Sequence, residues 1–150
     1  MNSNHNFKIT YKNSKDVKIT ITYVHKKDHR DKSPQKAQWT ISEQEERSCF
    51  KFGMESSWNI PVFVSWGLHL DNEAKASNLG TTALDTGEVI QSCFAKFRDD
   101  DKKNEWHGYP ADHRKNQDRP PLIVLNSWKE KNYLPKAKIS KIQRGKKFKI

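Results

Sequence analysis

The sequence is poor in cysteine and in long apolar runs, and both deficits narrow the classes of protein to which it can belong. Only two cysteines occur in 150 residues, whereas a small disulfide-stabilised domain needs several pairs. The longest apolar stretch, residues 60–70, is interrupted by polar residues and is shorter than the roughly 20 residues that a membrane-spanning helix needs. Residues 1–6 are polar and lack the apolar core of a secretory signal. These absences predict a cytoplasmic protein with no membrane partner.

Sequence fingerprints of nucleotide cofactors and of common hydrolases are also missing. The chain contains no Walker loop, no dinucleotide-binding glycine motif and no G-x-S-x-G elbow. His25 and His29 have the spacing of two metal ligands on one helix face, but their segment lacks a helical pattern. His107, Asp112 and His113 are competent ligands, yet no second cysteine or histidine pair completes a zinc motif. The sequence therefore predicts neither a cofactor nor a metal ion.

Positive charge is abundant and unevenly distributed along the chain. The formal net charge is +10, of which residues 1–40 contribute +6, residues 41–90 contribute −5 and residues 91–150 contribute +9. Basic ends that lie together would form one positive face, and such a face attracts phosphate groups. The densest region is residues 129–150, with nine basic side chains and one acidic side chain.

The order of apolar patterns predicts a single α+β domain over residues 1–150, with a small, mostly antiparallel sheet. Alternating β-branched residues at 7–10 and 17–24, separated by a turn-like segment, predict an N-terminal β-hairpin. Residues 60–70 and 88–98 predict two further strands, and the first is apolar enough to lie at the centre of the sheet.

One central helix and two short C-terminal helices are predicted to pack on this sheet. The helices are expected over residues 42–52, 121–132 and 134–145. The first begins with overlapping capping boxes and is followed by Gly53 as a possible stop. Two loops remain: a flexible basic loop at residues 25–38 and a long polar loop at residues 99–119. Loops as long as the second are usually functional or disordered.

The candidate chemistry lies in this long loop, where Trp106 and His107 are followed closely by His113 and Arg114. Two imidazoles beside a cation are the groups that a metal-independent endoribonuclease of the toxin type uses. One imidazole would act as base and the other as acid, while Arg114 stabilised the charge on phosphorus. The competing interpretation has Trp106 and Tyr109 anchoring the loop to the core, with both histidines solvated.

The basic C-terminal region is the second candidate site. The residues expected to contact nucleic acid are Trp106, Tyr109, Lys136, Lys138, Lys141, Arg144, Lys146 and Lys147. The two aromatic side chains could stack on bases while the basic side chains neutralise the phosphate backbone. The two C-terminal helices with a tight turn also permit a helix-turn-helix-like dock. The alternative is that the lysines only keep the protein soluble.

Three functions follow from these patterns. The first is a small accessory protein that binds RNA or DNA through its basic face. The second is a metal-independent endoribonuclease that uses His107 and His113. The third is a protein–protein interaction module whose acidic middle or aromatic loop docks a protein partner. The sequence contains no signal for a particular oligomeric state.

Overall fold

The computed structural model describes residues 5–150, which form eight strands and three α-helices. In chain order the strands are β1 (His5–Lys12), β2 (Lys18–His25), β3 (Gln38–Trp39), β4 (Val64–Leu68), β5 (Gly80–Ala83), β6 (Val89–Ser92), β7 (Phe94–Arg98) and β8 (Glu105–Pro110). The helices are α1 (Glu43–Glu55), α2 (Leu122–Glu130) and α3 (Lys136–Gln143), with 3-10 turns η1 (Lys27–His29) and η2 (Asn116–Asp118).

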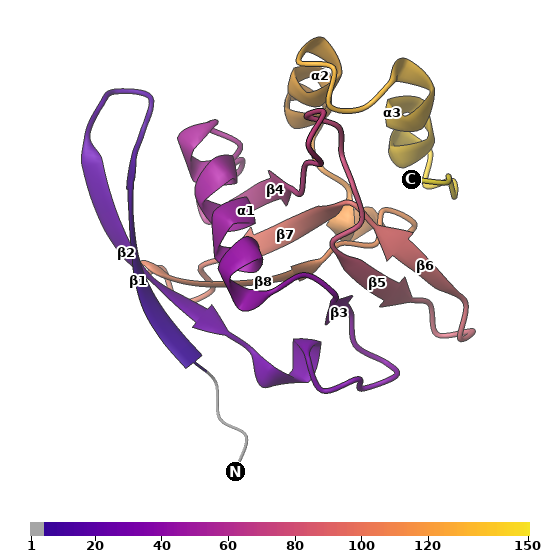
Figure 1. Cartoon of the computed structure of the whole chain (residues 1–150), viewed down its shortest axis with the longest axis horizontal. Helices are drawn as coiled ribbons and strands as arrows, with labels where there is room; N and C mark the ends of the chain where they lie inside the picture. Colours follow the sequence, from indigo (N-terminus) through magenta and orange to yellow (C-terminus); the bar gives the residue numbers. More distant parts are fainter. Residues whose placement is uncertain (1–4) are drawn as a thin grey trace.

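The strands form two sheets, one of order β1-β2-β8-β7-β4 and one of order β3-β5-β6. Every pairing between these strands is antiparallel except that between β2 and β8. Figure 1 shows α1 lying across one face of the larger sheet, with α2 and α3 together near the C-terminus. The predicted α+β class, with a hairpin, a mostly antiparallel sheet, a central helix and two C-terminal helices, is confirmed.

The N-terminal hairpin forms as its alternating pattern predicts. Strands β1 and β2 pair in register from His5 opposite His25 to Lys12 opposite Lys18. One face carries buried apolar side chains, including Ile9 and Ile21. On the other face polar side chains meet across the strands, as where the hydroxyls of Thr10 and Thr20 lie 2.8 Å apart. The period of two therefore separates a core face from a solvent face.

Helix α1 begins where its capping residues place it. The Ser42 hydroxyl accepts a hydrogen bond from the Glu45 amide at 3.1 Å, and the Glu45 carboxylate accepts one from the Ser42 amide at 3.0 Å. The predicted stop at Gly53 is wrong, because the helix continues to Glu55. A Cβ atom on Gly53 would lie 2.2 Å from the carbonyl oxygen of Trp66. The glycine is thus needed for close packing of α1 on β4.

Two predictions about the central strands are wrong in position. Strand β4 covers only Val64–Leu68 and lies at an edge of the sheet, not at its centre. Residues 88–98 form two strands, because the chain leaves the smaller sheet after Ser92 and enters the larger sheet at Phe94. Strands β7 and β8 occupy interior positions instead.

The long loop predicted at residues 99–119 contains strand β8, so that prediction is wrong over Glu105–Pro110. Trp106, Gly108 and Pro110 are buried, whereas the residues between them are less buried. Gly108 lies against the ring of Phe97, where a Cβ atom would approach the ring to 2.2 Å. The glycine and proline that indicate a loop in sequence are here part of a closely packed interior strand.

The basic segment predicted as a flexible loop, residues 25–38, is held by specific contacts. The Arg30 guanidinium donates to the buried Glu46 carboxylate at 2.7 Å and to the carbonyl of Ile41 at 2.8 Å. The Gln38 side chain accepts from the backbone amide of Lys32 at 2.8 Å. A buried carboxylate needs charged or polar partners, and Arg30 satisfies this need while fixing η1 against α1.

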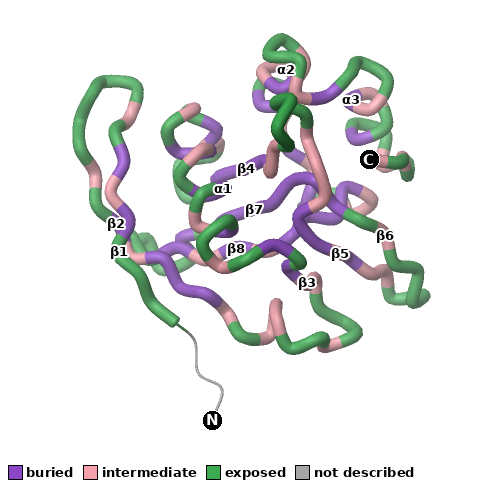
Figure 2. The backbone as a smooth tube through the Cα atoms, in the orientation of Figure 1, coloured by how far each residue is buried: buried purple, intermediate pink, exposed green. Residues whose placement is uncertain are grey.

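The core consists of two clusters on opposite faces of the larger sheet. The first lies beneath α1 and includes Phe50, Phe97 and Trp106. The second lies beneath α2 and α3 and includes Phe94 and Trp128. Figure 2 shows the resulting buried stretches along β7 and β8. Within residues 5–150 no helix combines the length and apolarity needed to cross a membrane.

Candidate functional site

Four polar side chains are brought together on one face of the larger sheet. The register of β7 and β8 places Lys96 opposite Tyr109 and Arg98 opposite His107. Because side chains alternate across a sheet, all four lie on the face away from α1. Phe97, which lies between Lys96 and Arg98 in β7, points to the opposite face and into the core beneath α1. The sequence therefore builds a polar site and an apolar core from the same two strands.

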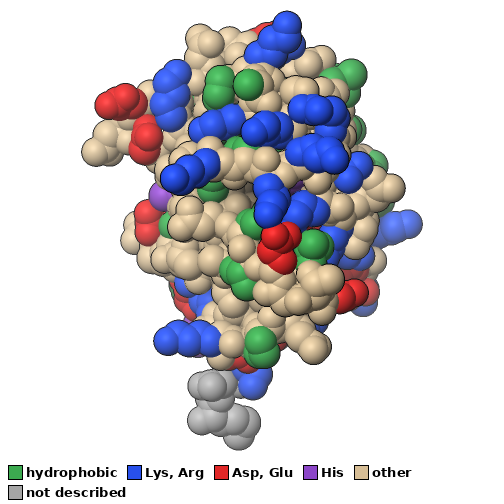
Figure 3. Space-filling view, turned by 90° about the vertical axis from the view of Figure 1, so that its right-hand side faces the viewer, with side chains coloured by type: hydrophobic (Ala, Val, Ile, Leu, Met, Phe, Trp, Pro, Cys, Tyr) green, Lys and Arg blue, Asp and Glu red, His purple; other side chains and the backbone are tan. Residues whose placement is uncertain are grey.

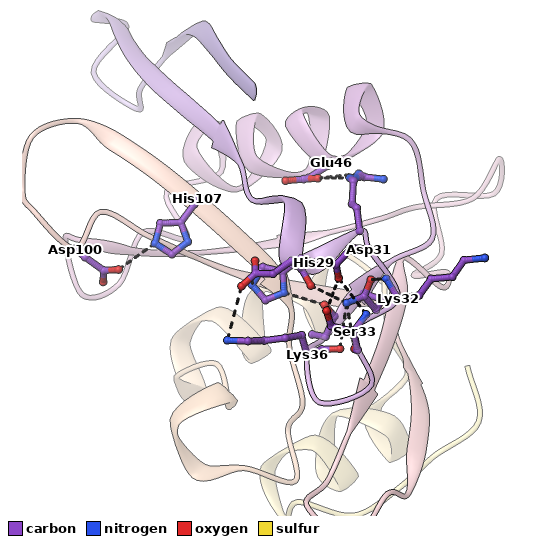
Figure 4. Close-up of polar contacts among 12 residues, drawn as sticks. His29, Asp31, Lys32, Ser33, Lys36, Glu46, Asp100 and His107 are labelled. Carbon is purple, nitrogen blue, oxygen red and sulfur yellow. Dashed lines mark hydrogen bonds and ion pairs between the residues drawn. The ribbon is translucent and has the colours of Figure 1, made fainter. Parts of the chain in front are cut away.

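A pocket of about 340 Å³ lies over this polar face. Arg98, His107 and Tyr109 line it from the sheet, and two more segments complete its wall. The segment around η1 contributes His29 and Lys36, and the segment around η2 contributes Lys115, Gln117 and Asp118. Figure 4 shows His29 and Lys36 on the η1 segment and His107 directed toward Asp100. We call this the sheet pocket.

His29 is held in a defined orientation and tautomer. Its Nδ1 atom lies 2.8 Å from the carbonyl oxygen of Ala37, and a carbonyl can only accept, so Nδ1 carries the hydrogen. The ring stacks on Tyr109 with centroids 5.5 Å apart. Its Nε2 atom lies 3.9 Å from the Asp28 carboxylate, and the side chain is 14% exposed. The neutral ring therefore presents the lone pair of Nε2.

Arg98 and His107 converge on one carboxylate. Asp100 accepts a hydrogen bond from Arg98 Nε at 2.9 Å and from His107 Nε2 at 3.0 Å. The hydrogen bond from His107, together with the charge of Arg98, lowers the pKa of Asp100. The Asp100 side chain is 48% exposed and that of His107 is 23% exposed. The buried Nδ1 atom of His107 has no hydrogen-bond partner. The chain thus already holds an anionic group between a guanidinium and an imidazole.

A hydrogen-bonded group supports the floor of the sheet pocket. The Tyr109 hydroxyl donates to Asp118 at 2.8 Å, and burial raises the pKa of Tyr109, so its phenol stays protonated. The Lys96 ammonium donates to the carbonyl of Gln117 and lies 3.9 Å from Asp118. Burial lowers the pKa of Lys96, and the nearby Asp118 opposes this effect. These contacts tie η2 to β7 and β8.

The predicted catalytic set of His107, His113 and Arg114 is not brought together. Neither His113 nor Arg114 lines the sheet pocket that His107 lines. His113 is 4% exposed, its Nε2 donates to the carbonyl of Lys146 at 2.6 Å, and burial lowers its pKa. Arg114 donates twice to the Asp112 carboxylate, at 2.9 and 2.8 Å. Strand β8 ends at Pro110, so the two later residues follow a different path and have structural contacts.

The prediction that Trp106 stacks on bases is also wrong. The side chain is 3% exposed and lies in the core beneath α1, with its ring centroid 5.5 Å from that of Phe50. Tyr109 is half-buried, stacks on His29 and uses its hydroxyl for Asp118. Tyr109 is therefore a wall of the sheet pocket and is not an open platform for a base.

A second candidate site is a set of basic side chains on α3 and the segment after it. We call it the α3 basic surface, and its members are Lys136, Lys138, Lys141, Arg144, Lys146 and Lys147. All are exposed except Lys138, which is half-buried. Lys147 pairs with Glu88 at 2.7 Å, and the other five form no ion pair with any of residues 5–150. Figure 3 shows lysine and arginine side chains gathered on the face of the molecule where α3 lies.

The basic N-terminal hairpin does not extend the α3 basic surface. In Figure 1 the β1–β2 hairpin and α3 lie at opposite ends of the molecule. The expectation that basic ends of the chain could form one face is therefore not met by these two elements. The α3 basic surface must be considered by itself.

Sequence reasoning found His107 and Tyr109 but missed the other members of the sheet pocket. The pairing of β7 with β8 brings Arg98 to His107. His29 and Lys36 come from the separate η1 segment, where His29 stacks on Tyr109 of β8. The one available signal was alternation, since polar residues recur at every second position in both strands.

The described residues, 5–150, place no group of three His, Cys, Asp or Glu side chains where it could hold a metal ion. The sheet pocket is lined by imidazole, phenol, basic and carboxylate side chains, the carboxylates being Asp112 and Asp118, and imidazole and carboxylate groups are the usual acids and bases of proton transfer. Comparisons with protein-family models, with curated proteins and with solved structures find no match to this chain.

Proposed function

We propose that the protein binds nucleic acid, RNA or DNA, through the α3 basic surface. The observation that carries the proposal is that five exposed or half-exposed basic side chains of this surface have no acidic partner among residues 5–150. Lysine and arginine bind phosphate backbones strongly because binding releases condensed counterions. A short, rigid stretch of such residues is therefore suited to a polyanion.

The packing of α3 supports this proposal because it fixes the helix that carries the basic side chains. Ile139 and Ile142 are buried beneath the helix, next to Trp128 of α2. Lys136 and Lys141 consequently lie on the outer side of a helix whose inner side is anchored. Two packed helices joined by a short turn also permit the second helix to enter a DNA groove, as in helix-turn-helix proteins.

Solubility alone accounts less well for this surface. Like charges that lie close together repel one another and destabilise the folded state. Acidic side chains elsewhere on the protein relieve such repulsion, as Glu88 does for Lys147. Within the part of the chain that the structure describes, the remaining members of the α3 basic surface pair with no acidic side chain, which favours an anionic partner.

Charge reversal tests the proposal. The variant K136E/K141E/K146E should bind labelled RNA and duplex DNA at least about tenfold more weakly than the unaltered protein, because it replaces phosphate-binding cations by repelling anions. The matched control is K15E/K18E/K51E, which makes the same change in net charge on exposed residues of the hairpin and α1. Binding is measured by gel retardation between about 50 mM and about 200 mM salt.

The control should keep most of its affinity, and the unaltered protein should lose affinity steeply as salt rises. Equal losses in the two triple variants would contradict the proposal, because net charge alone would then explain binding. Absence of binding at low salt would contradict it as well. In that case a protein partner would become the leading alternative.

A further inference from the structure

We infer that the sheet pocket cleaves RNA, with His29 as the base and His107 as the acid in an attack by the ribose 2′-hydroxyl on the adjacent phosphodiester. The pocket is separate from the α3 basic surface. The inference rests on the proposed function only in that an RNA strand must reach the protein.

The geometry of His29 suits a general base. Its Nδ1–H is committed to the carbonyl of Ala37, so the neutral ring keeps the lone pair on Nε2. The ring is fixed by stacking on Tyr109 and lines the sheet pocket. A general base needs both a defined lone pair and access to the proton that it removes. Lys36, on the same wall of the pocket, lies 3.8 Å from the exposed Asp28 carboxylate and would have to exchange this partner for the phosphate.

Arg98 and His107 form the part of the pocket that would hold the phosphodiester. Both donate to the Asp100 carboxylate, which is half-exposed and lies in the turn that follows β7. Exposed ion pairs of this kind contribute little to stability. Little free energy is therefore lost when a ligand displaces the Asp100 carboxylate from Arg98 and His107. A phosphodiester offers the same charge and more acceptor oxygens. It would displace Asp100 and place the His107 Nε2–H beside the leaving oxygen.

The other four described histidines have contacts that explain them structurally. The exposed His5 pairs with Glu43 at 3.2 Å. His25 is buried beside Glu46 at 3.1 Å and Arg47 at 3.0 Å, and His113 is bonded to Lys146. His69 contacts Ser77 at 2.9 Å. Among the pockets described within residues 5–150, the sheet pocket is the one lined by two histidines, His29 and His107. The buried Nδ1 atoms of His107 and His25 both lack a hydrogen-bond partner.

The reaction needs no further reactant. The 2′-hydroxyl gives its proton to His29 Nε2 as its oxygen forms a bond to phosphorus. The bond from phosphorus to the 5′-oxygen breaks, and that oxygen takes the Nε2 proton of His107. His107 must enter this step as an imidazolium, protonated on both ring nitrogens, so that the loss of one proton leaves a neutral ring. Arg98 stabilises the charge that develops on the phosphoryl oxygens. The products are a 2′,3′-cyclic phosphate and a free 5′-hydroxyl.

The first experiment compares cleavage of labelled single-stranded RNA with that of DNA of the same sequence, using the whole chain. RNA should be cut to fragments that end in 2′,3′-cyclic phosphate, and DNA should remain intact because it lacks the attacking hydroxyl. His29→Gln and His107→Gln should each lower the cleavage rate by about 100-fold, the usual contribution of one acid or base. The matched control is His5→Gln, since His5 is exposed on the edge strand β1.

A second variant tests the phosphate position without removing a catalytic group. Asp100→Asn removes the competing charge and should lower the KM for RNA several-fold, while Asp101→Asn should leave it unchanged. Equal KM values for the two variants would contradict the assignment of the phosphate to Arg98 and His107. This measurement stays informative if a histidine variant fails to fold.

The outcomes separate this inference from the proposed function. Retarded RNA that is never cleaved would overturn the catalytic inference and leave nucleic-acid binding intact. Cleavage that persists in His29→Gln and His107→Gln would also overturn it. Cleavage that is lost in these variants but unaffected by charge reversal on α3 would support the inference and contradict the proposed binding surface.

Discussion

At the scale of single residues, the histidines of this protein lie in two kinds of environment, one at a pocket and one in the packed interior. His29 and His107 line the sheet pocket, whereas His113 holds the C-terminal segment through the carbonyl of Lys146. The difference lies in what surrounds each ring. His113 packs against Phe94 and Phe148, and an apolar setting disfavours a charged imidazole.

The environment of His113 predicts a specific pH dependence of stability. Burial lowers its pKa below the ordinary 6.5, so the unfolded chain takes up a proton before the folded protein does. The stabilisation is present above the unfolded pKa and is lost as pH falls from about 6.5 toward the folded pKa, with a slope of up to about 1.4 kcal/mol per pH unit. His113→Gln should reduce this slope.

The measurement is urea unfolding of both proteins between about pH 7.5 and about pH 5. His5→Gln serves as the control and should keep the slope of the unaltered protein. Carboxylates with lowered pKa values, such as Asp100 and Glu45, lose their contribution only at lower pH. Identical slopes in His113→Gln and the unaltered protein would show that His113 is not held neutral.

At the scale of elements, the ion pair between Arg30 and Glu46 anchors the η1 segment to α1, in addition to the hydrogen bonds made by Gln38. Arg30 binds the Glu46 carboxylate, which is 1% exposed and also accepts a hydrogen bond from the Tyr23 hydroxyl at 2.6 Å. Because the Glu46 charge is buried, loss of a partner costs about 3 kcal/mol or more. The same contact places His29, one residue before Arg30, at the sheet pocket.

Arg30→Ala should therefore loosen the η1 segment as well as lower the free energy of unfolding. We expect faster hydrogen exchange at the amides of residues 27–37, with smaller changes in α2 and α3. Lys26→Ala is the matched control, because the Lys26 side chain forms no ion pair with residues 5–150. Unchanged exchange at residues 27–37 in Arg30→Ala would contradict the anchoring role of this pair.

Elements whose signals are local could be predicted from the sequence. The hairpin has clear alternation, α1 has its capping box, and α2 and α3 begin after Pro121 and Pro135. Strand β8 could not be predicted in this way, because Gly108 and Pro110 indicate a turn. It is a strand because it pairs with β7 and, over two residues, with β2.

The two candidate sites also differ in whether their residues are close together in the sequence. The α3 basic surface is contiguous in sequence, so its residues could be named before the fold was known. The sheet pocket combines His29, Arg98 and His107, which are separated by long stretches of chain. His113 and Arg114 are close to His107 in sequence but do not line the pocket with it. Closeness in sequence therefore did not predict closeness in space, because β8 ends at Pro110, between His107 and His113.

At the scale of the whole molecule, the net charge of +10 draws a polyanion to the protein but does not choose its site. The hairpin and α3 lie at opposite ends of the molecule, and both carry exposed lysines. Electrostatic attraction brings nucleic acid to any basic region. A binding site requires in addition that the basic side chains be grouped on one packed element, and we propose α3 because Ile139 and Ile142 anchor its inner side.

The most direct test of nucleic-acid binding at α3 is a titration of the isotope-labelled protein with RNA, followed by amide proton–nitrogen correlation spectra. We predict that chemical shifts change first over residues 136–147. In the His29→Gln protein, in which we expect cleavage of the RNA to be slow, we predict further changes at the sheet pocket. Shift changes confined to the β1–β2 hairpin, or no changes at all at low salt, would contradict the account.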